Sequence, residues 1–132
     1  MPSARFHHIL VVEDDVSLRF TLAEWLRHLH YVVYETANAD EAKIILASPL
    51  PVDLVVTDVD MPGSMSGLDL VDNMRHAAPG IPAIVVSGNS VAHQITKAKG
   101  IPFFQKPYSF DKIATAIGTF ITKNNTEESD HG

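Results

Sequence analysis

Residues 53–63 read DLVVTDVDMPG, and this stretch decides the fold of the chain. The run from Asp53 to Thr57 is apolar almost throughout, as expected for a central strand that is buried on both faces of a parallel sheet. The run ends at an acid, Asp58, and the Pro, Gly and Ser residues that follow exclude regular structure. We therefore predict a central strand with a carboxylate at its carboxyl end, followed by a long loop.

Other apolar runs of strand length also end at polar residues. Glu13 and Asp14 follow HHILVV, Ser87 follows PAIVV, and Lys106 follows IPFFQ, and a further strand is predicted near Tyr31–Glu35. The carboxyl ends of parallel strands share one edge of the sheet, and open α/β sheets bind ligands there. We expect these acids, the hydroxyl and the ammonium to meet with Asp58 at this edge.

Segments of helical period separate the apolar runs. Helices are predicted near residues 15–29, after Asn38 or Asp40, near 67–77 and 91–98, and after Pro107. Five strands alternating with five helices predict an α/β fold with a parallel sheet. The chain is expected to form a single domain over residues 1–132, with a polar C-terminal tail at 123–132.

Composition and charge narrow the function. The chain has 132 residues, a formal net charge of −6 and no block of basic residues, which argues against a nucleic-acid partner. The absence of cysteine excludes disulfides and thiolate chemistry. No apolar run approaches the roughly 18 residues of a membrane span, so we expect no membrane partner and a cytoplasmic protein.

The predicted acidic cluster favours a metal. Glu13, Asp14 and Asp58 would repel one another, and Lys106 alone would offset only part of their charge. Carboxylates and a backbone carbonyl are the ligands that Mg²⁺ prefers. A carboxylate can also accept a phosphoryl group while a cation and a lysine offset the charge on its oxygens.

The seven histidines do not predict a second metal site. His28 and His30 are two residues apart and so do not share a helix face, and His7 and His8 are expected on alternate sides of a strand. We interpret them as solvated or edge residues.

Four segments together resemble the receiver domain of response regulators, the phosphoacceptor half of two-component signalling. They are ILVVEDD, VVTDVDMPG, VVSGN and FFQKPY, in the family's order and at about its spacing, and the resemblance covers a core of about residues 6–122. It implies a flavodoxin-like fold, a three-layer sandwich with strand order 2-1-3-4-5.

The resemblance implies a metal site and a phosphorylation site. Asp58 matches the phosphorylated aspartate, Asp14 the more direct ligand of Mg²⁺ or Mn²⁺, and Glu13 its acidic neighbour. Asp60 matches the residue whose backbone carbonyl binds the metal.

It also implies a switch. Ser87 matches the hydroxyl residue that turns toward the phosphoryl group, Lys106 the lysine that pairs with it, and Phe103 the aromatic switch position. Asp60 and Asn89 match positions that influence the lifetime of the phosphoryl group. The bond from Lys106 to Pro107 is often cis in the family.

By this resemblance the chain takes a phosphoryl group from a sensor histidine kinase or a histidine phosphotransfer protein. It would be no enzyme beyond its own phosphorylation and dephosphorylation. A downstream protein would bind the surface of the fourth helix, fifth strand and fifth helix, and the chain would be a monomer or weak dimer. We expect a stand-alone regulator more than a fragment of a larger one.

The chain departs from the family pattern in three places. Ser64 lengthens the loop after Asp58, Phe103 replaces the commoner Tyr, and the stretch from Ser87 to Lys106 is a few residues short. The fourth helix is therefore expected to be short or irregular.

Three other functions compete with this interpretation. Asp58-Val-Asp60 also resembles the Asp-x-Asp pair of haloacid-dehalogenase-type phosphohydrolases, although that pair follows the first strand. A flavin or nucleotide binder would share the fold, but no Gly-rich phosphate loop follows the first strand. A receiver-like module that binds partners without phosphorylation is the third alternative.

Overall fold

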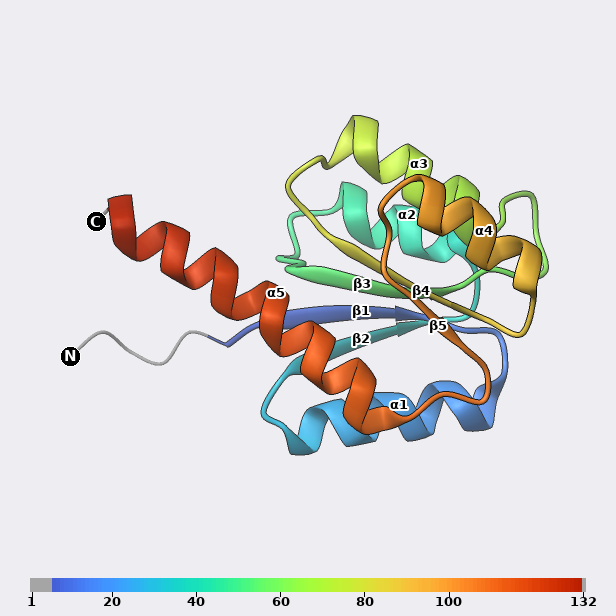
Figure 1. The fold of residues 1–132 in the computed structure, drawn as a ribbon, viewed down its shortest axis with the longest axis horizontal. Coiled ribbons are helices and arrows are strands. Elements are labelled where there is room, and N and C mark those ends of the chain that lie inside the picture. Colours follow the sequence, from blue (N-terminus) through green and yellow to red (C-terminus); the bar gives the residue numbers. More distant parts are fainter. Residues whose placement is uncertain (1–5, 132) are drawn as a thin grey trace.

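The computed structural model describes residues 6–131, and it describes their side chains as far as residue 122. Strands and helices alternate along this part of the chain (Figure 1). The elements are β1 (His8–Val12), α1 (Val16–His28), β2 (Val32–Thr36), α2 (Ala39–Ala47), β3 (Leu54–Asp58), α3 (Gly67–Ala77), β4 (Ala83–Ser87), α4 (Ser90–Ala98), β5 (Phe103–Gln105) and α5 (Phe110–His131).

The strands form one parallel sheet in the order β2-β1-β3-β4-β5, which is the predicted flavodoxin-like order. The register places Val12 beside Thr57, and Asp58 beside Val86. The carboxyl ends of β1, β3 and β4 therefore lie at one edge of the sheet. β3 is the central strand and all of its residues are buried, as its apolar sequence predicted.

Helices cover both faces of the sheet and bury two sets of side chains. Figure 1 shows α1 and α5 on one face and α2, α3 and α4 on the other. Alternate residues of each strand point to opposite faces, so in β1 the side chains of Ile9 and Val11 join one core cluster and those of Leu10 and Val12 join the other. Burial on both faces explains why the strands are apolar runs and not alternating patterns.

Side-chain caps determine where several helices begin. Asp15 caps α1, with its Oδ1 accepting a hydrogen bond from Leu18 N at 2.9 Å, and Asn38, one of the two predicted candidates, caps α2. Ser66 and Asp69 form a reciprocal capping box at the start of α3. These caps accept hydrogen bonds from backbone N–H groups in the first turn of each helix. They therefore fix the residue at which each helix begins and the preceding loop ends.

The last two helices, α4 and α5, belong to the surface that is predicted to bind a downstream protein. α4 has nine residues, as the short spacing from Ser87 to Lys106 predicted, and Gly100 follows it with a φ of +70°. α5 continues to His131, so the stretch at 123–131 that we expected as a tail is helical in its backbone. Within the described residues, no helix is long and apolar enough to cross a membrane.

Candidate functional site at the carboxyl edge of the sheet

The carboxyl edge of the sheet brings three predicted acids together. Glu13 and Asp14 follow β1 directly, and Asp58 is the last residue of β3. One carboxylate oxygen from each lies within 4.8 Å of the other two. Glu13 and Asp58 are buried, with relative exposures of 3% each, and Asp14 is exposed. The cluster therefore consists of two buried acids, Glu13 and Asp58, with the exposed acid Asp14 beside them.

Lys106 supplies the cation that the buried pair requires. It follows β5, and its Nζ lies 3.0 Å from Asp58 Oδ2 and 2.7 Å from Glu13 Oε1. Its backbone N–H donates to the carbonyl of Ser87 at 2.9 Å, which ties this residue to the end of β4. The following bond to Pro107 is cis, as the resemblance implied.

Burial and neighbouring charges shift the pKa values of Glu13 and Lys106. Burial raises the pKa of Glu13, the charge of Asp58 raises it further, and the hydrogen bond from Lys106 opposes both, so the pKa reaches about 7. Burial alone would lower the pKa of Lys106, but hydrogen bonds to Glu13 and Asp58 outweigh it and raise the pKa. The lysine therefore stays charged, while Glu13 titrates near neutral pH.

The donor set fits a hard divalent cation. Asp58 uses Oδ2 to accept from Lys106, but its Oδ1 is buried and has no hydrogen-bond partner among the described residues. A buried acceptor without a partner is costly, so this oxygen is available to a ligand. Glu13 and Asp14 each place an oxygen within 4.8 Å of an Asp58 oxygen, and oxygen ligands are those that Mg²⁺ binds. The residues present therefore fit the predicted metal.

Ser87 reaches the same edge but does not hydrogen-bond to Asp58. Its hydroxyl donates to Asp60 Oδ2 over a long 3.4 Å and accepts from Asn89 N at 3.0 Å. Asn89 in turn caps α4, with its Oδ1 accepting from Val91 N at 2.8 Å. The hydroxyl of Ser87 is thus engaged with the two positions that the resemblance assigned to phosphoryl lifetime.

Phe103, the predicted switch residue, is half-buried at the start of β5. Its ring stacks on that of His93 in α4, with centroids 4.7 Å apart and planes 6° apart. Sequence reasoning missed His93, because the histidine pattern indicates only solvated or edge residues. Which side of α4 faces β5 depends on the rotation of this short helix about its axis. The sequence periodicity therefore could not predict that His93 contacts Phe103.

Gly67 is a second residue that sequence reasoning missed. A Cβ at this position would lie 1.9 Å from the backbone carbonyl oxygen of Asp58, and the N–H of Gly67 donates to the carbonyl of Val59 at 3.0 Å. Only a residue without a side chain allows this close approach. Gly67 therefore lets the start of α3 rest on the backbone beside the acidic pair.

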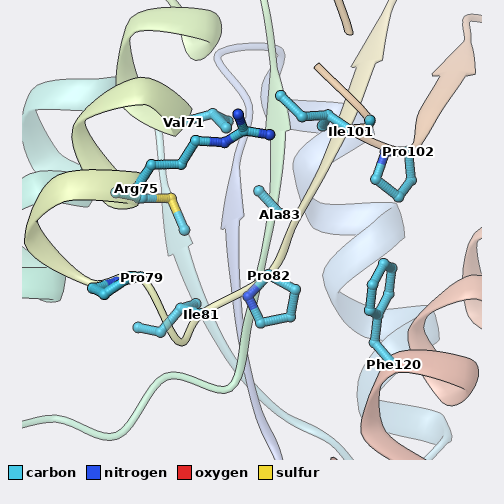
Figure 2. Close-up of a pocket in the computed structure, with 11 residues that line it drawn as sticks. Val71, Arg75, Pro79, Ile81, Pro82, Ala83, Ile101, Pro102 and Phe120 are labelled. Carbon is cyan, nitrogen blue, oxygen red and sulfur yellow. The ribbon is translucent and has the colours of Figure 1, made fainter. Parts of the chain in front are cut away.

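A cavity of about 210 Å³ lies away from the acids, beside the amino ends of β4 and β5. Figure 2 shows Arg75 of α3 on one side of Ala83 and Pro102 on the other. The Arg75 guanidinium donates to the carbonyl of Lys99 at 2.8 Å. None of the predicted site residues lines this cavity, so it is separate from the acidic site.

The chain is similar to proteins of two-component signalling. It matches the response regulator receiver domain model over residues 9–118. It is 28% identical over 116 residues to sporulation initiation phosphotransferase F of Bacillus subtilis (strain 168), covering 86% of this chain and 92% of that protein. It is 32% identical over 121 residues to sensor kinase CckA of Brucella abortus (strain 2308), covering 89% of this chain but only 13% of that kinase.

A solved structure has the same fold. It is that of response regulator protein TrrA from Thermotoga maritima in complex with Mg²⁺-BeF, with a TM-score of 0.78 and 25% identity over 87% of this chain and 99% of that one. The family model covers most of the chain, and the fold and acidic edge agree with it. The chain belongs to the family of response regulator receiver domains.

Proposed function

We propose that Asp58 is the phosphoacceptor of this receiver domain. The observation that carries the proposal is the state of its carboxylate, which is buried, held through Oδ2 by Lys106, and open to a ligand at Oδ1. The other predicted acids, Glu13 and Asp14, flank it. Among the described side chains, Glu13 is also buried beside Lys106, but its second oxygen, Oε2, accepts from the backbone N–H of Asp15 at 3.2 Å.

The donor is a phosphohistidine of a sensor kinase or phosphotransfer protein. An O–P bond forms at the Asp58 carboxylate as the donor's N–P bond breaks, and the released imidazole keeps the electron pair and takes up a proton from water. Lys106 offsets negative charge on the transferring oxygens. Membership of the receiver family and the similarity to phosphotransferase F support this donor class.

Asp14, Glu13, Asp58 and the backbone carbonyl of Asp60 would hold Mg²⁺, and Mn²⁺ would bind the same oxygens. When bound, the cation offsets the charge of the acids and of the incoming phosphoryl group. The similar TrrA protein was solved in complex with Mg²⁺-BeF, which supports this choice of metal.

The switch we propose begins at Ser87. Its hydroxyl leaves Asp60 for the phosphoryl oxygens, Phe103 turns into the space that Ser87 vacates, and the surface of α4, β5 and α5 changes. A downstream protein that prefers this surface shifts the population toward the phosphorylated form. Asp60 and Asn89, which contact Ser87, would set how long the phosphoryl group lasts.

In this proposal residues 1–132 act as one receiver domain of the cytoplasm, with a core of about 6–122. The domain is a monomer or weak dimer and a signalling module, not an enzyme with a separate substrate. The rival class is a receiver-like module that binds partners without phosphorylation.

Intact mass spectrometry tests the proposal. The wild type and Asp58→Asn are incubated with a small phosphodonor, with and without Mg²⁺. The wild type is expected to gain one phosphoryl group only with the metal, and the variant none. Exposed Asp111 offers a matched control, since Asp111→Asn should be phosphorylated like the wild type. Failure of the wild type with both small donors and a phosphorylated histidine phosphotransfer protein would favour the phosphorylation-independent module.

A further inference from the structure

The stack of His93 on Phe103 joins α4 to β5. The two rings are nearly parallel, with centroids 4.7 Å apart. His93 is exposed on α4, and Phe103 is half-buried. Ring pairs at this separation are mutually attractive beyond the area that they bury. The contact therefore favours the arrangement in which Phe103 lies against α4.

Polar contacts hold α4 at its two ends. Asn89 caps the first turn, and Lys99, just after the last, donates from Nζ to Asp72 Oδ1 at 2.9 Å while its carbonyl accepts from Arg75. Between these ends, α4 buries only the side chains of Ala92 and Thr96. A helix with so little buried surface is held in part by the His93 ring, so this residue is placed to influence the β5 side of the helix.

In the switch proposed above, Phe103 turns toward Ser87, and this movement would separate its ring from that of His93. The hydroxyl of Ser87 is engaged by Asp60 and Asn89, and the ring of Phe103 is engaged by His93. Both contacts are present together in this structure, which the proposed switch assigns to the resting form. A change that moves Phe103 inward must break the stack.

We propose that His93 is a positioning residue that holds Phe103 in the resting position and so opposes the switch. The inference rests on the function proposed above and deepens it. Because the proposed movement of Phe103 separates the two rings, the free energy of the stack would have to be overcome when the site is phosphorylated or binds a phosphoryl mimic. Removing the ring shifts the population toward the active form and raises the apparent affinity for the mimic.

Beryllofluoride titration in the presence of Mg²⁺ tests this role. His93→Ala and His93→Gln both lack the ring and should bind the mimic roughly two- to tenfold more tightly than the wild type. His93→Phe keeps a ring and should bind like the wild type. Gln94, an exposed neighbour on the same helix, provides the matched control Gln94→Ala, which should also bind like the wild type.

A second measurement follows the Phe103 ring without metal or mimic. Stacking on His93 shifts the ring protons of Phe103 in nuclear magnetic resonance spectra. Both ringless variants should lose this shift and move toward the mimic-bound wild-type position, whereas His93→Phe should not. A purely structural role for His93 would lower thermal stability without moving these signals toward the bound position.

The outcomes separate the two proposals. If the wild type binds the mimic but the ringless variants bind it equally or more weakly, the role of His93 is overturned and the phosphoacceptor function stands. Loss of the distinction between His93→Phe and His93→Ala would also overturn it. A wild type that neither binds the mimic nor accepts a phosphoryl group would overturn the proposed function, and the role of His93 with it.

Discussion

Lys106 Nζ lies 3.0 Å from Asp58 Oδ2, although 48 residues separate the two along the chain. The same Nζ lies 2.7 Å from Glu13, so one ammonium neutralises part of the charge of two buried carboxylates. One negative charge remains in excess when both acids are ionised. The site is therefore set up to take up a proton or a cation.

Replacing Lys106 with Met should destabilise the protein in a pH-dependent way. At pH 8 the variant leaves two buried acids without their cation, and we expect the free energy of unfolding to fall by roughly 3 kcal/mol. At pH 5 the loss should be smaller because Glu13 is protonated there. Urea unfolding at both pH values measures the difference, with Lys112→Met at an exposed position as the control. An equal loss at both pH values would contradict this electrostatic account.

The raised pKa of Glu13 predicts a specific pH profile in the absence of divalent metal. Its folded pKa of about 7 exceeds the ordinary value of 4.5, so between these values the folded protein binds more protons than the unfolded chain. The free energy of unfolding should therefore decrease as pH rises through this window, by at most about 3 kcal/mol from this group. Glu13→Gln should flatten the profile, and chemical denaturation between pH 4.5 and 8 would measure it. A wild-type profile that rises through the window would refute the assignment.

Asp14→Ala should leave the metal-free fold intact or slightly more stable, because like-charge repulsion at the site decreases. It should also reduce the stabilisation that Mg²⁺ gives to the wild type, since a ligand that binds only the folded state raises its apparent stability. Thermal unfolding with and without Mg²⁺ measures both effects, and Asp111→Asn serves as the control. Full retention of the Mg²⁺-induced shift would remove Asp14 from the metal site.

Tyr108→Phe should stabilise the metal-free protein by about 1 kcal/mol. The hydroxyl of Tyr108 is buried and has no hydrogen-bond partner among the described residues, and its ring packs edge-on against Phe110 at 5.6 Å. The substitution keeps the ring and removes the unpaired polar atom. Trp25 stacks on Phe110 at 5.7 Å, so its fluorescence follows the unfolding of this region. A loss of stability would show that the hydroxyl has a favourable partner.

The fold and the centre of the site were predictable because both follow from strand ends. Apolar runs placed Glu13, Asp58 and Lys106 at the carboxyl ends of parallel strands, and parallel topology puts those ends at one edge. The short fourth helix was also confirmed, since it depends on local sequence.

Contacts that depend on tertiary geometry were not predictable. The stack of His93 on Phe103 depends on how α4 is rotated against β5, and the approach of Gly67 to the Asp58 carbonyl depends on a loop path with no periodicity. His7 and His8 were expected on opposite sides of a strand. Both approach the same Asp53 oxygen, at 3.9 and 3.5 Å, and β1 begins only at His8.

The lysine of the site arrives with the last and shortest strand. β1 pairs with β3, which brings Glu13 and Asp58 together, and Lys106 comes from beyond β5 at the edge of the sheet. Without β5 the two acids would face each other with no cation from the protein, so the position of β5 relieves their repulsion. Completion of the sheet thus brings in the cation that offsets part of the charge of the two acids, and a chain that ended before Lys106 would carry both acids without it.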